Sequence, residues 1–299
     1  MNNKLKGTLV TLIAAASFGA AAPVAKIVYT SGITPNFMLA LRFLIAALFL
    51  WGYIFLNRNK INFILNKRQL FTMIVIGGLV YFLTTIFYYN AITFIPVSLH
   101  VMIFYTYPFM VSIFSFFVLK EKISKIQVFS LMLDFIGLVL TVSINSVGIH
   151  SIGIILSCSA AFFNGCYIIL LGLINISKVD SIVTAAYTTL FSSISFIIYC
   201  GIKSEIHFNI PLNAWLGIVF IAIVSTAIAI IALSKGVRMI GASRASIIST
   251  FEPLEGVILS FIFLGERMDI KQLFGIALIL IAIIMINYSG NKKLDINGV

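Results

Sequence analysis

VSLHVMIFYTYPFMVSIFSFFVL, residues 97–119, and SRASIISTFEPLEGVILSFIFL, residues 243–264, are apolar stretches of helix length, each with a proline near its middle. Pro108 and Pro253 coincide when the second half of the chain is laid over the first at a shift of 145 residues. The same shift pairs Glu121 with Glu266, Ser124 with Asp269 and Gln127 with Gln272. The chain is therefore an internal duplication, and each copy contains a proline-broken apolar segment.

The composition places this duplicated chain in a membrane. Apolar residues make up 61% of its 299 residues and charged residues 10%, with a mean hydropathy of +1.13, so it cannot cover a core with a polar surface. A helix needs about 20 apolar residues to cross a bilayer. About ten such stretches are predicted: 5–29, 35–57, 69–92, 97–119, 125–143, 151–174, 181–202, 212–236, 243–264 and 270–289. The expected fold is an all-α integral membrane protein.

The domain division follows the duplication. Residues 1–146 are predicted to form one five-helix repeat, residues 147–290 a second, and residues 291–299 a short cytoplasmic tail. Because five is odd, the second repeat must enter the membrane from the side opposite to the first. Two inverted repeats can exchange inward-open and outward-open states, which is the basis of alternating access in transporters.

The net charge of +11 reflects membrane orientation rather than nucleic-acid binding. Of the 20 Lys and Arg residues, fifteen fall on the predicted side of the two termini and three on the other, with Lys26 and Arg42 inside spans. By the positive-inside rule both termini are cytoplasmic, in a multi-pass protein of the cell membrane. The three cysteines lie in apolar spans, and His100, His150 and His207 map near the outer surface as isolated residues. No metal or cofactor is expected.

Three stretches carry a family resemblance: residues 14–19 (AAASFG) with Pro23 and Lys26, residues 35–42, and residues 251–267. Together they resemble the drug/metabolite transporter superfamily, specifically its ten-helix EamA-type members, over essentially the whole chain. The resemblance implies a carrier of small organic solutes, often an exporter of amino acids or related metabolites. Its path would be lined by predicted helices 1, 3, 4, 6, 8 and 9, with helices 5 and 10 peripheral. One departure is Ile169, which stands where the first repeat has Pro23.

Two features of the backbone are expected to shape this bundle. Each central proline lacks the N–H that would bond the carbonyl four residues back, on Phe104 and on Ser249. Those carbonyls need protein or water as partners in a bilayer, so the matched breaks indicate either a solute site or packing kinks. The small residues Ala15 and Gly19, repeated as Ala161 and Gly165, would let predicted helices 1 and 6 approach a neighbour closely.

Charged residues inside the spans are the strongest candidates for function. Glu252 and Glu255 lie three residues apart on one helix face, where each charge costs about 2.5–3.5 kcal/mol. Glu252 is a candidate for contact with solute or with a coupling proton. Glu255 either lines the same path or forms an ion pair with Arg42, which lies at a similar depth. Lys26 either contacts solute or extends to the interface. Asp134 is expected to have a partner within the bundle or at a dimer contact.

Aromatic residues complete the predicted path, since hydroxylated rings can stack on a solute or hold a cation. The path candidates taken together are Glu252, Glu255, Tyr107, Pro108, Pro253, Phe104, Ser249, Tyr88, Tyr89, Phe163, Tyr167 and Lys26.

The sequence thus predicts a secondary-active transporter of small organic metabolites, amino-acid-like or amphipathic. We expect export by alternating access, with protons as the candidate coupling ion. The alternative is a facilitated exchanger or uptake carrier for a cofactor-like or nucleotide-like solute. A channel or an intramembrane enzyme is disfavoured, because the chain shows no filter loop, metal-ligand cluster, phosphate-binding glycine loop or nucleophile elbow. The expected partners are a small-molecule substrate and the lipid bilayer, not nucleic acid, for a monomer or homodimer.

Overall fold

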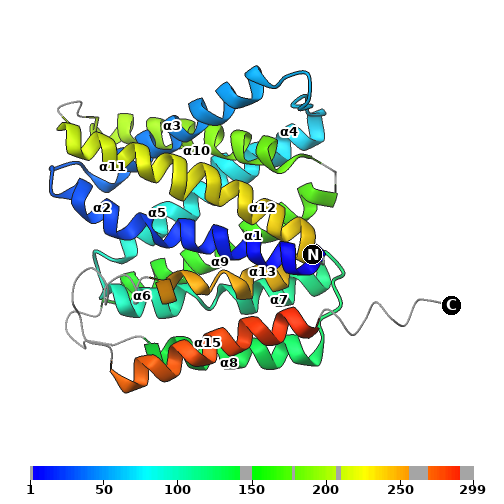
Figure 1. Ribbon diagram of the computed structural model, residues 1–299. Helices are drawn as coiled ribbons and strands as arrows, with labels where there is room; N and C mark the ends of the chain where they lie inside the picture. The colour runs from blue at the N-terminus through cyan, green and yellow to red at the C-terminus, as the bar shows by residue number, and fades with distance from the viewer. Residues whose placement is uncertain (1–2, 142–149, 177–178, 207–209, 256–268, 290–299) are drawn as a thin grey trace.

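The computed structural model describes residues 3–141, 150–176, 179–206, 210–255 and 269–289. Every regular element within those ranges is helical, as Figure 1 shows. The prediction of an all-α membrane protein is confirmed. Seven helical stretches of the described residues are long and apolar enough to cross a bilayer. The total of ten spans stays a prediction.

The helices follow the expected spans, several of which are divided by breaks. The first repeat contains α1 (Asn3–Gly19), α2 (Ala21–Tyr29), α3 (Pro35–Leu56), α4 (Lys67–Met73), the π-helical segment η1 (Ile74–Tyr81), α5 (Phe82–Ala91), α6 (Val97–Phe104), α7 (Tyr107–Phe117) and α8 (Lys125–Thr141). The second contains α9 (Ser151–Ile176), α10 (Ser181–Lys203), α11 (Leu212–Ala222), the π-helical segment η2 (Ile223–Ile228), α12 (Ala229–Ile240), α13 (Ala242–Ile248), a helical stretch at 251–255, and α15 (Ile270–Ser289).

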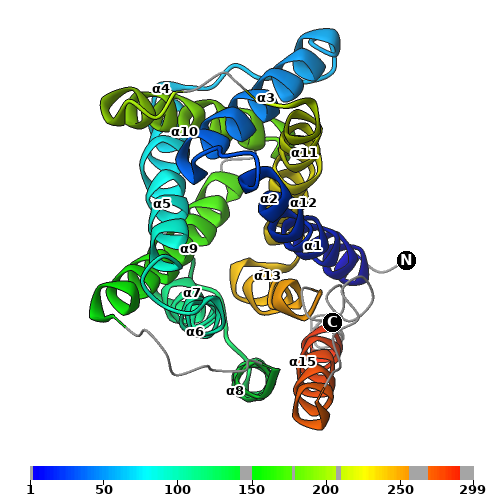
Figure 2. The same cartoon turned by 90° about the vertical axis from the view of Figure 1, so that its left-hand side faces the viewer.

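The two repeats are inverted, as predicted. In Figure 1, α1 with α2 and their counterpart α9 run in opposite directions, and so do α8 and α15. Repeat-equivalent pairs pack alike, because α1 lies against α12 as α9 lies against α5, while α3 packs on α10 and α8 on α15. Figure 2 shows α8 and α15 at one side of the bundle, which agrees with the peripheral position implied by the family resemblance.

Small residues set the closest helix contacts. A Cβ added to Gly7 would lie 2.5 Å from Ile240 Cγ2, and one added to Gly153 would lie 2.5 Å from Ile95 Cγ2. Gly19 faces the Glu255 carboxylate, and a Cβ on Gly165 would lie 3.5 Å from Met110 Cβ. These are repeat-equivalent contacts. Gly7, Gly19 and Gly153 lie closer to their neighbours than a larger residue would allow, whereas Gly165 is at an ordinary contact distance.

Both central helices break just before their prolines. Residues 105–106 form the turn between α6 and α7, and residues 249–250 form the matching turn after α13. Pro108 lies in the first turn of α7, where a missing N–H costs nothing. The Ser249 carbonyl, which we expected to need a partner from elsewhere, accepts a hydrogen bond from the Glu252 N–H at 3.1 Å. The tightened turn therefore supplies the partner locally.

Valine at Gly77 is expected to destabilise the fold strongly, because the added Cβ would collide with the Thr188 carbonyl and Cα of α10. Overpacking against a rigid neighbour costs about 1–3 kcal/mol. The matched control is Gly52→Val, since nothing lies within 4 Å of a Cβ at Gly52. Thermal unfolding of the detergent-solubilised variants should show a clear drop in Tm for Gly77→Val alone. Equal Tm values would contradict this packing.

Candidate functional site

A cavity of about 430 Å³ lies inside the bundle. Its walls come from α1, α2, η1, α5, α6, α7, α9, α12 and the turn after α13, and Arg42 of α3 also lines it. No described residue of α8 or α15 lines it. The path implied by the family resemblance therefore corresponds to this cavity, with the correction that the second predicted helix contributes through Arg42.

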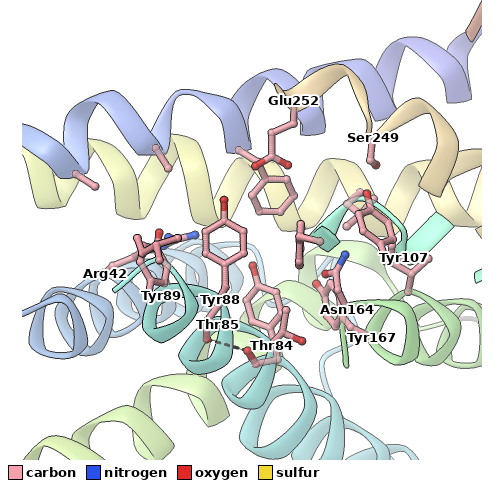
Figure 3. Close-up of a pocket in the computed structure, with 18 of the residues that line it drawn as sticks. Arg42, Thr84, Thr85, Tyr88, Tyr89, Tyr107, Asn164, Tyr167, Ser249 and Glu252 are labelled. Carbon is pink, nitrogen blue, oxygen red and sulfur yellow. Dashed lines mark hydrogen bonds between the residues drawn. The ribbon is translucent and has the colours of Figure 1, made fainter. Parts of the chain in front are cut away.

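The two broken helices meet at the cavity. Phe104 and Tyr107 enter from the first repeat, and their repeat equivalents Ser249 and Glu252 enter from the second. Figure 3 shows Tyr107 and Ser249 at one end of the cavity and Glu252 near its middle. Pro108 and Pro253 do not line it. The prolines thus shape the backbone, while their neighbours present side chains.

Arg42 is held at the other end of the cavity by the π-helical segment of the opposite repeat. Its Nε donates to Thr226 Oγ1 at 2.6 Å and its Nη2 donates to the Ser225 carbonyl at 3.2 Å. Thr226 Oγ1 in turn donates to the Ile221 carbonyl at 3.0 Å. Because arginine has five N–H donors, three are left for a bound solute. π-helical segments within α-helices frequently occur at functional sites.

The equivalent π segment, η1, is bonded in the same manner. Ser192 Oγ and Ser195 Oγ of α10 donate to the Gly77 and Gly78 carbonyls at 2.9 and 2.7 Å. In each repeat, side chains from α3 or α10 of the other repeat therefore satisfy the π-helical carbonyls. The first repeat receives neutral serines and the second receives a charged arginine, so the positive charge of the cavity is a departure from symmetry.

Tyrosines separate the two charges. Figure 3 shows Arg42 beside Tyr89, and Tyr88 lying between them and Glu252. The Tyr105 hydroxyl hydrogen-bonds Glu252 from outside the cavity lining. The cavity therefore combines one guanidinium, one carboxyl group and hydroxylated rings.

Five of the aromatic path candidates line the cavity: Phe104, Tyr88, Tyr89, Tyr107 and Tyr167. Phe163 does not, and packs instead against Phe87 with ring centroids 5.7 Å apart.

Four lining residues with polar groups were not anticipated: Tyr29, Thr84, Thr85 and Asn164. Asn164 could have been found as an amide in the middle of an apolar span. The others carry no such signal, because their position depends on how each helix is rotated about its axis.

The structure does not bring Arg42 and Glu255 together. Arg42 is bonded to η2, and Glu255 Oε2 is buried with no hydrogen-bond partner among the described residues. Glu255 lies behind Gly19 and does not line the cavity. The side chain of Lys26 lies outside the described part of the chain.

Two polar residues of the helices have partners deep in the bundle. Asp134 is buried, with its Oδ1 2.7 Å from Thr250 Oγ1, so it has a partner within the bundle, which was one of the two expectations for it. His100 lies in the first turn of α6, near the helix end as expected. It is fully buried there, with Nδ1 2.8 Å from Ser157 Oγ. Its burial follows from its position on the face of α6 that packs toward α9.

Comparisons with known proteins agree with this architecture. The model of the EamA-like transporter family matches residues 5–143 and again residues 151–288. The uncharacterized transporter YcbK of Bacillus subtilis is 26% identical over 90% of this chain and 88% of its own length. The uncharacterized inner membrane transporter YicL of Salmonella typhimurium is 25% identical over 98% and 99%. One solved crystal structure shares the fold, with a TM-score of 0.78 at 17% identity over 97% of this chain and 99% of that chain.

Inverted helical repeats around a buried polar cavity define a polytopic membrane transporter. Since both repeats match the family model, the chain belongs to the EamA-like transporter family.

Proposed function

We propose that this transporter carries small organic metabolites that bear both a carboxylate and an ammonium group, amino-acid-like or amphipathic in character. The observation that carries the proposal is the pairing of Arg42 and Glu252 in one tyrosine-lined cavity. Arg42 would bind the carboxylate through its remaining N–H donors, and Glu252 would bind the ammonium. The volume of about 430 Å³ lies in the range of small-molecule sites.

We further propose that the solute crosses by exchange between two states of the inverted repeats, residues 1–146 and 147–290, with residues 291–299 as a tail. Between the cavity and the end where α1 begins, α7 and α13 are tied together. Ser112 Oγ lies 2.9 Å from Ser243 Oγ, and Glu121 accepts hydrogen bonds from the Ala242 and Ser243 N–H groups at 2.8 and 3.3 Å. These contacts support a state closed on that side.

That side is proposed to be cytoplasmic, which puts both termini in the cytoplasm of a cell-membrane protein. The start of α1 and the end of α15 lie at the same end of the bundle in Figure 1, together with the α3–α4 connection and its Arg58 and Lys60. Among described basic residues, Lys203 and Lys271 lie toward the opposite end, where α10 ends and α15 begins. With this orientation, export driven by inward proton movement is the proposed direction. The alternative is facilitated exchange or uptake of a cofactor-like or nucleotide-like solute, which the tyrosine rings of the cavity would also suit.

A ligand screen distinguishes the two solute classes. Purified protein is heated with apolar and aromatic amino acids, with their methyl esters and N-acetyl derivatives, and with nucleosides and nucleotides. A ligand present at 100 times its Kd adds about 2.7 kcal/mol to stability. We expect the unmodified amino acids to raise the Tm and both blocked derivatives to do so less. A rise with nucleotides alone would refute the proposed class and favour the alternative.

Flux in proteoliposomes then tests the coupling. An imposed pH gradient should drive accumulation of the solute found in the screen. Exchange that proceeds at the same rate without the gradient would favour the facilitated carrier.

A further inference from the structure

Asp134 is an acidic group buried outside the solute cavity. It lies on the peripheral helix α8, is 3% exposed, and does not line the cavity. Its Oδ1 is 2.7 Å from Thr250 Oγ1, which belongs to the turn that breaks the second repeat. Ser249, in the same turn, and Glu252, two residues after Thr250, line the cavity. The Asp134–Thr250 contact therefore reaches the outer side of the same backbone whose inner side forms the solute site.

The hydrogen atoms available at this contact bear on the form of the carboxyl group. Thr250 Oγ1 is also 2.5 Å from the Ile247 carbonyl, which can only accept. A hydroxyl has one hydrogen, so a carboxylate and that carbonyl would share it, as the Tyr81 and Phe82 carbonyls share the hydroxyl of Thr85. When Asp134 carries a proton and donates it to Thr250, which then donates to Ile247, each contact has its own hydrogen. The geometry therefore accommodates the neutral acid.

The surroundings of Asp134 favour the same form. Lys125 of α8 and Lys271 of α15 lie in the first turns of their helices, with Lys125 about 13 Å along the helix from Asp134. Arg244 is in the first turn of α13, and Tyr107 is the ionisable group of α7 that interacts with Asp134 electrostatically. Beyond the turn, Glu252 bonds to Tyr105, and Glu255 would add repulsion rather than a countercharge. No described cation pairs with Asp134, and a buried unpaired carboxylate is costly.

The two helix breaks are tied to carboxyl groups in different ways. Tyr105, the repeat equivalent of Thr250, hydrogen-bonds Glu252 in the centre of the bundle. Thr250 bonds Asp134 at the periphery, and the repeat equivalent of Asp134 is Ile279, which has no polar group. The duplication therefore does not require an acid at position 134. Its presence makes one break dependent on a titratable group that the solute does not touch.

We propose that Asp134 is a proton-binding site whose occupancy holds the break at residues 249–250 in the arrangement seen. Loss of the proton leaves a buried carboxylate that competes with the Ile247 carbonyl for the single Thr250 hydrogen. The turn then rearranges, and with it the cavity wall formed by Ser249 and Glu252. If the proposed proton-coupled export holds, Asp134 carries the coupling proton. This role rests on the proposed function, whereas the proton-binding site itself does not.

Infrared spectroscopy of the purified protein tests the proton directly, without any solute. At neutral pH the carbonyl stretch of protonated carboxylic acids should contain a component that Asp134→Asn removes. The matched control, Asp180→Asn, alters an exposed helix cap that asparagine serves equally well and should leave the component unchanged. Identical acid bands in the wild type and Asp134→Asn would overturn the proposal. If Asp134→Asn does not fold, Thr250→Val is used instead and should shift the frequency of the Asp134 acid band. An unshifted band would also overturn the proposal.

Thiol labelling tests the link to the break. In a background without the three native cysteines, Ser249→Cys is labelled with a membrane-impermeant thiosulfonate over a range of pH. Because the thiolate is the reacting form, labelling rises with pH in every variant. With Asp134 present the rise should be steeper than the thiolate fraction alone gives, and Asp134→Asn, whose amide donates to Thr250 as the neutral acid does, should lose that extra pH dependence. Thr250→Val should also lose it and Thr250→Ser should retain it. A pH dependence unchanged by Asp134→Asn would show that the break does not respond to this proton.

Discussion

Arg42→Gln is expected to weaken binding of an unmodified amino-acid solute by about 10- to 100-fold. A hydrogen bond to a charged group contributes about 1.5–3 kcal/mol, and three of the five guanidinium N–H donors are not used in the bonds to η2. The measurement is the Kd of the solute for detergent-solubilised protein, repeated with its methyl ester. The ester lacks the carboxylate, so its Kd should change little in the variant.

Two further variants sharpen this result. Arg42→Lys keeps the positive charge but lacks the planar five-donor guanidinium. With two of its three N–H donors taken by Thr226 and Ser225, only one is left for the carboxylate, so it should bind the solute nearly as weakly as Arg42→Gln. Arg58→Gln, in an exposed loop, should bind as the wild type does. An equal loss of affinity for the acid and its ester in Arg42→Gln would mean that Arg42 supports the fold and does not touch the carboxylate.

Glu252→Gln should have a similar effect on the other end of the solute. Because its carboxyl group lines the cavity, its loss should weaken binding of the free amine by about 10- to 100-fold and leave the N-acetyl derivative almost unaffected. Glu255→Gln is the matched control, three residues away and buried behind Gly19 instead of in the cavity. Its Kd should remain close to that of the wild type. A larger loss in Glu255→Gln than in Glu252→Gln would place the ammonium site elsewhere.

The sequence predicted the architecture because hydropathy, the 145-residue shift and the placement of charges are local or additive properties. The inverted repeats, the breaks beside Pro108 and Pro253, and the close approach at Gly19 followed from those properties alone. The meeting of Glu252 with Tyr107 in one cavity was also predicted, since repeat symmetry relates the two positions.

The partners of the charged residues could not be predicted in the same way. Depth in the membrane matched Arg42 with Glu255, but depth carries no information on how each helix is rotated. In the structure Arg42 faces the π segment of the other repeat, and Glu255 faces Gly19. The burial of His100 was not predicted for a related reason, because a position near a helix end does not say which face is covered by α9. The π segments themselves leave no recognisable sequence signal.

The most direct test of the account is solute counterflow. Proteoliposomes are loaded with the unlabelled solute that binds best, and labelled solute is added outside at a trace concentration. A carrier that alternates access to the Arg42–Glu252 cavity should accumulate label transiently and saturably, and the double variant Arg42→Gln/Glu252→Gln should not. Uptake that rises linearly with concentration, shows no transient accumulation and is unaffected by the double variant would contradict the account.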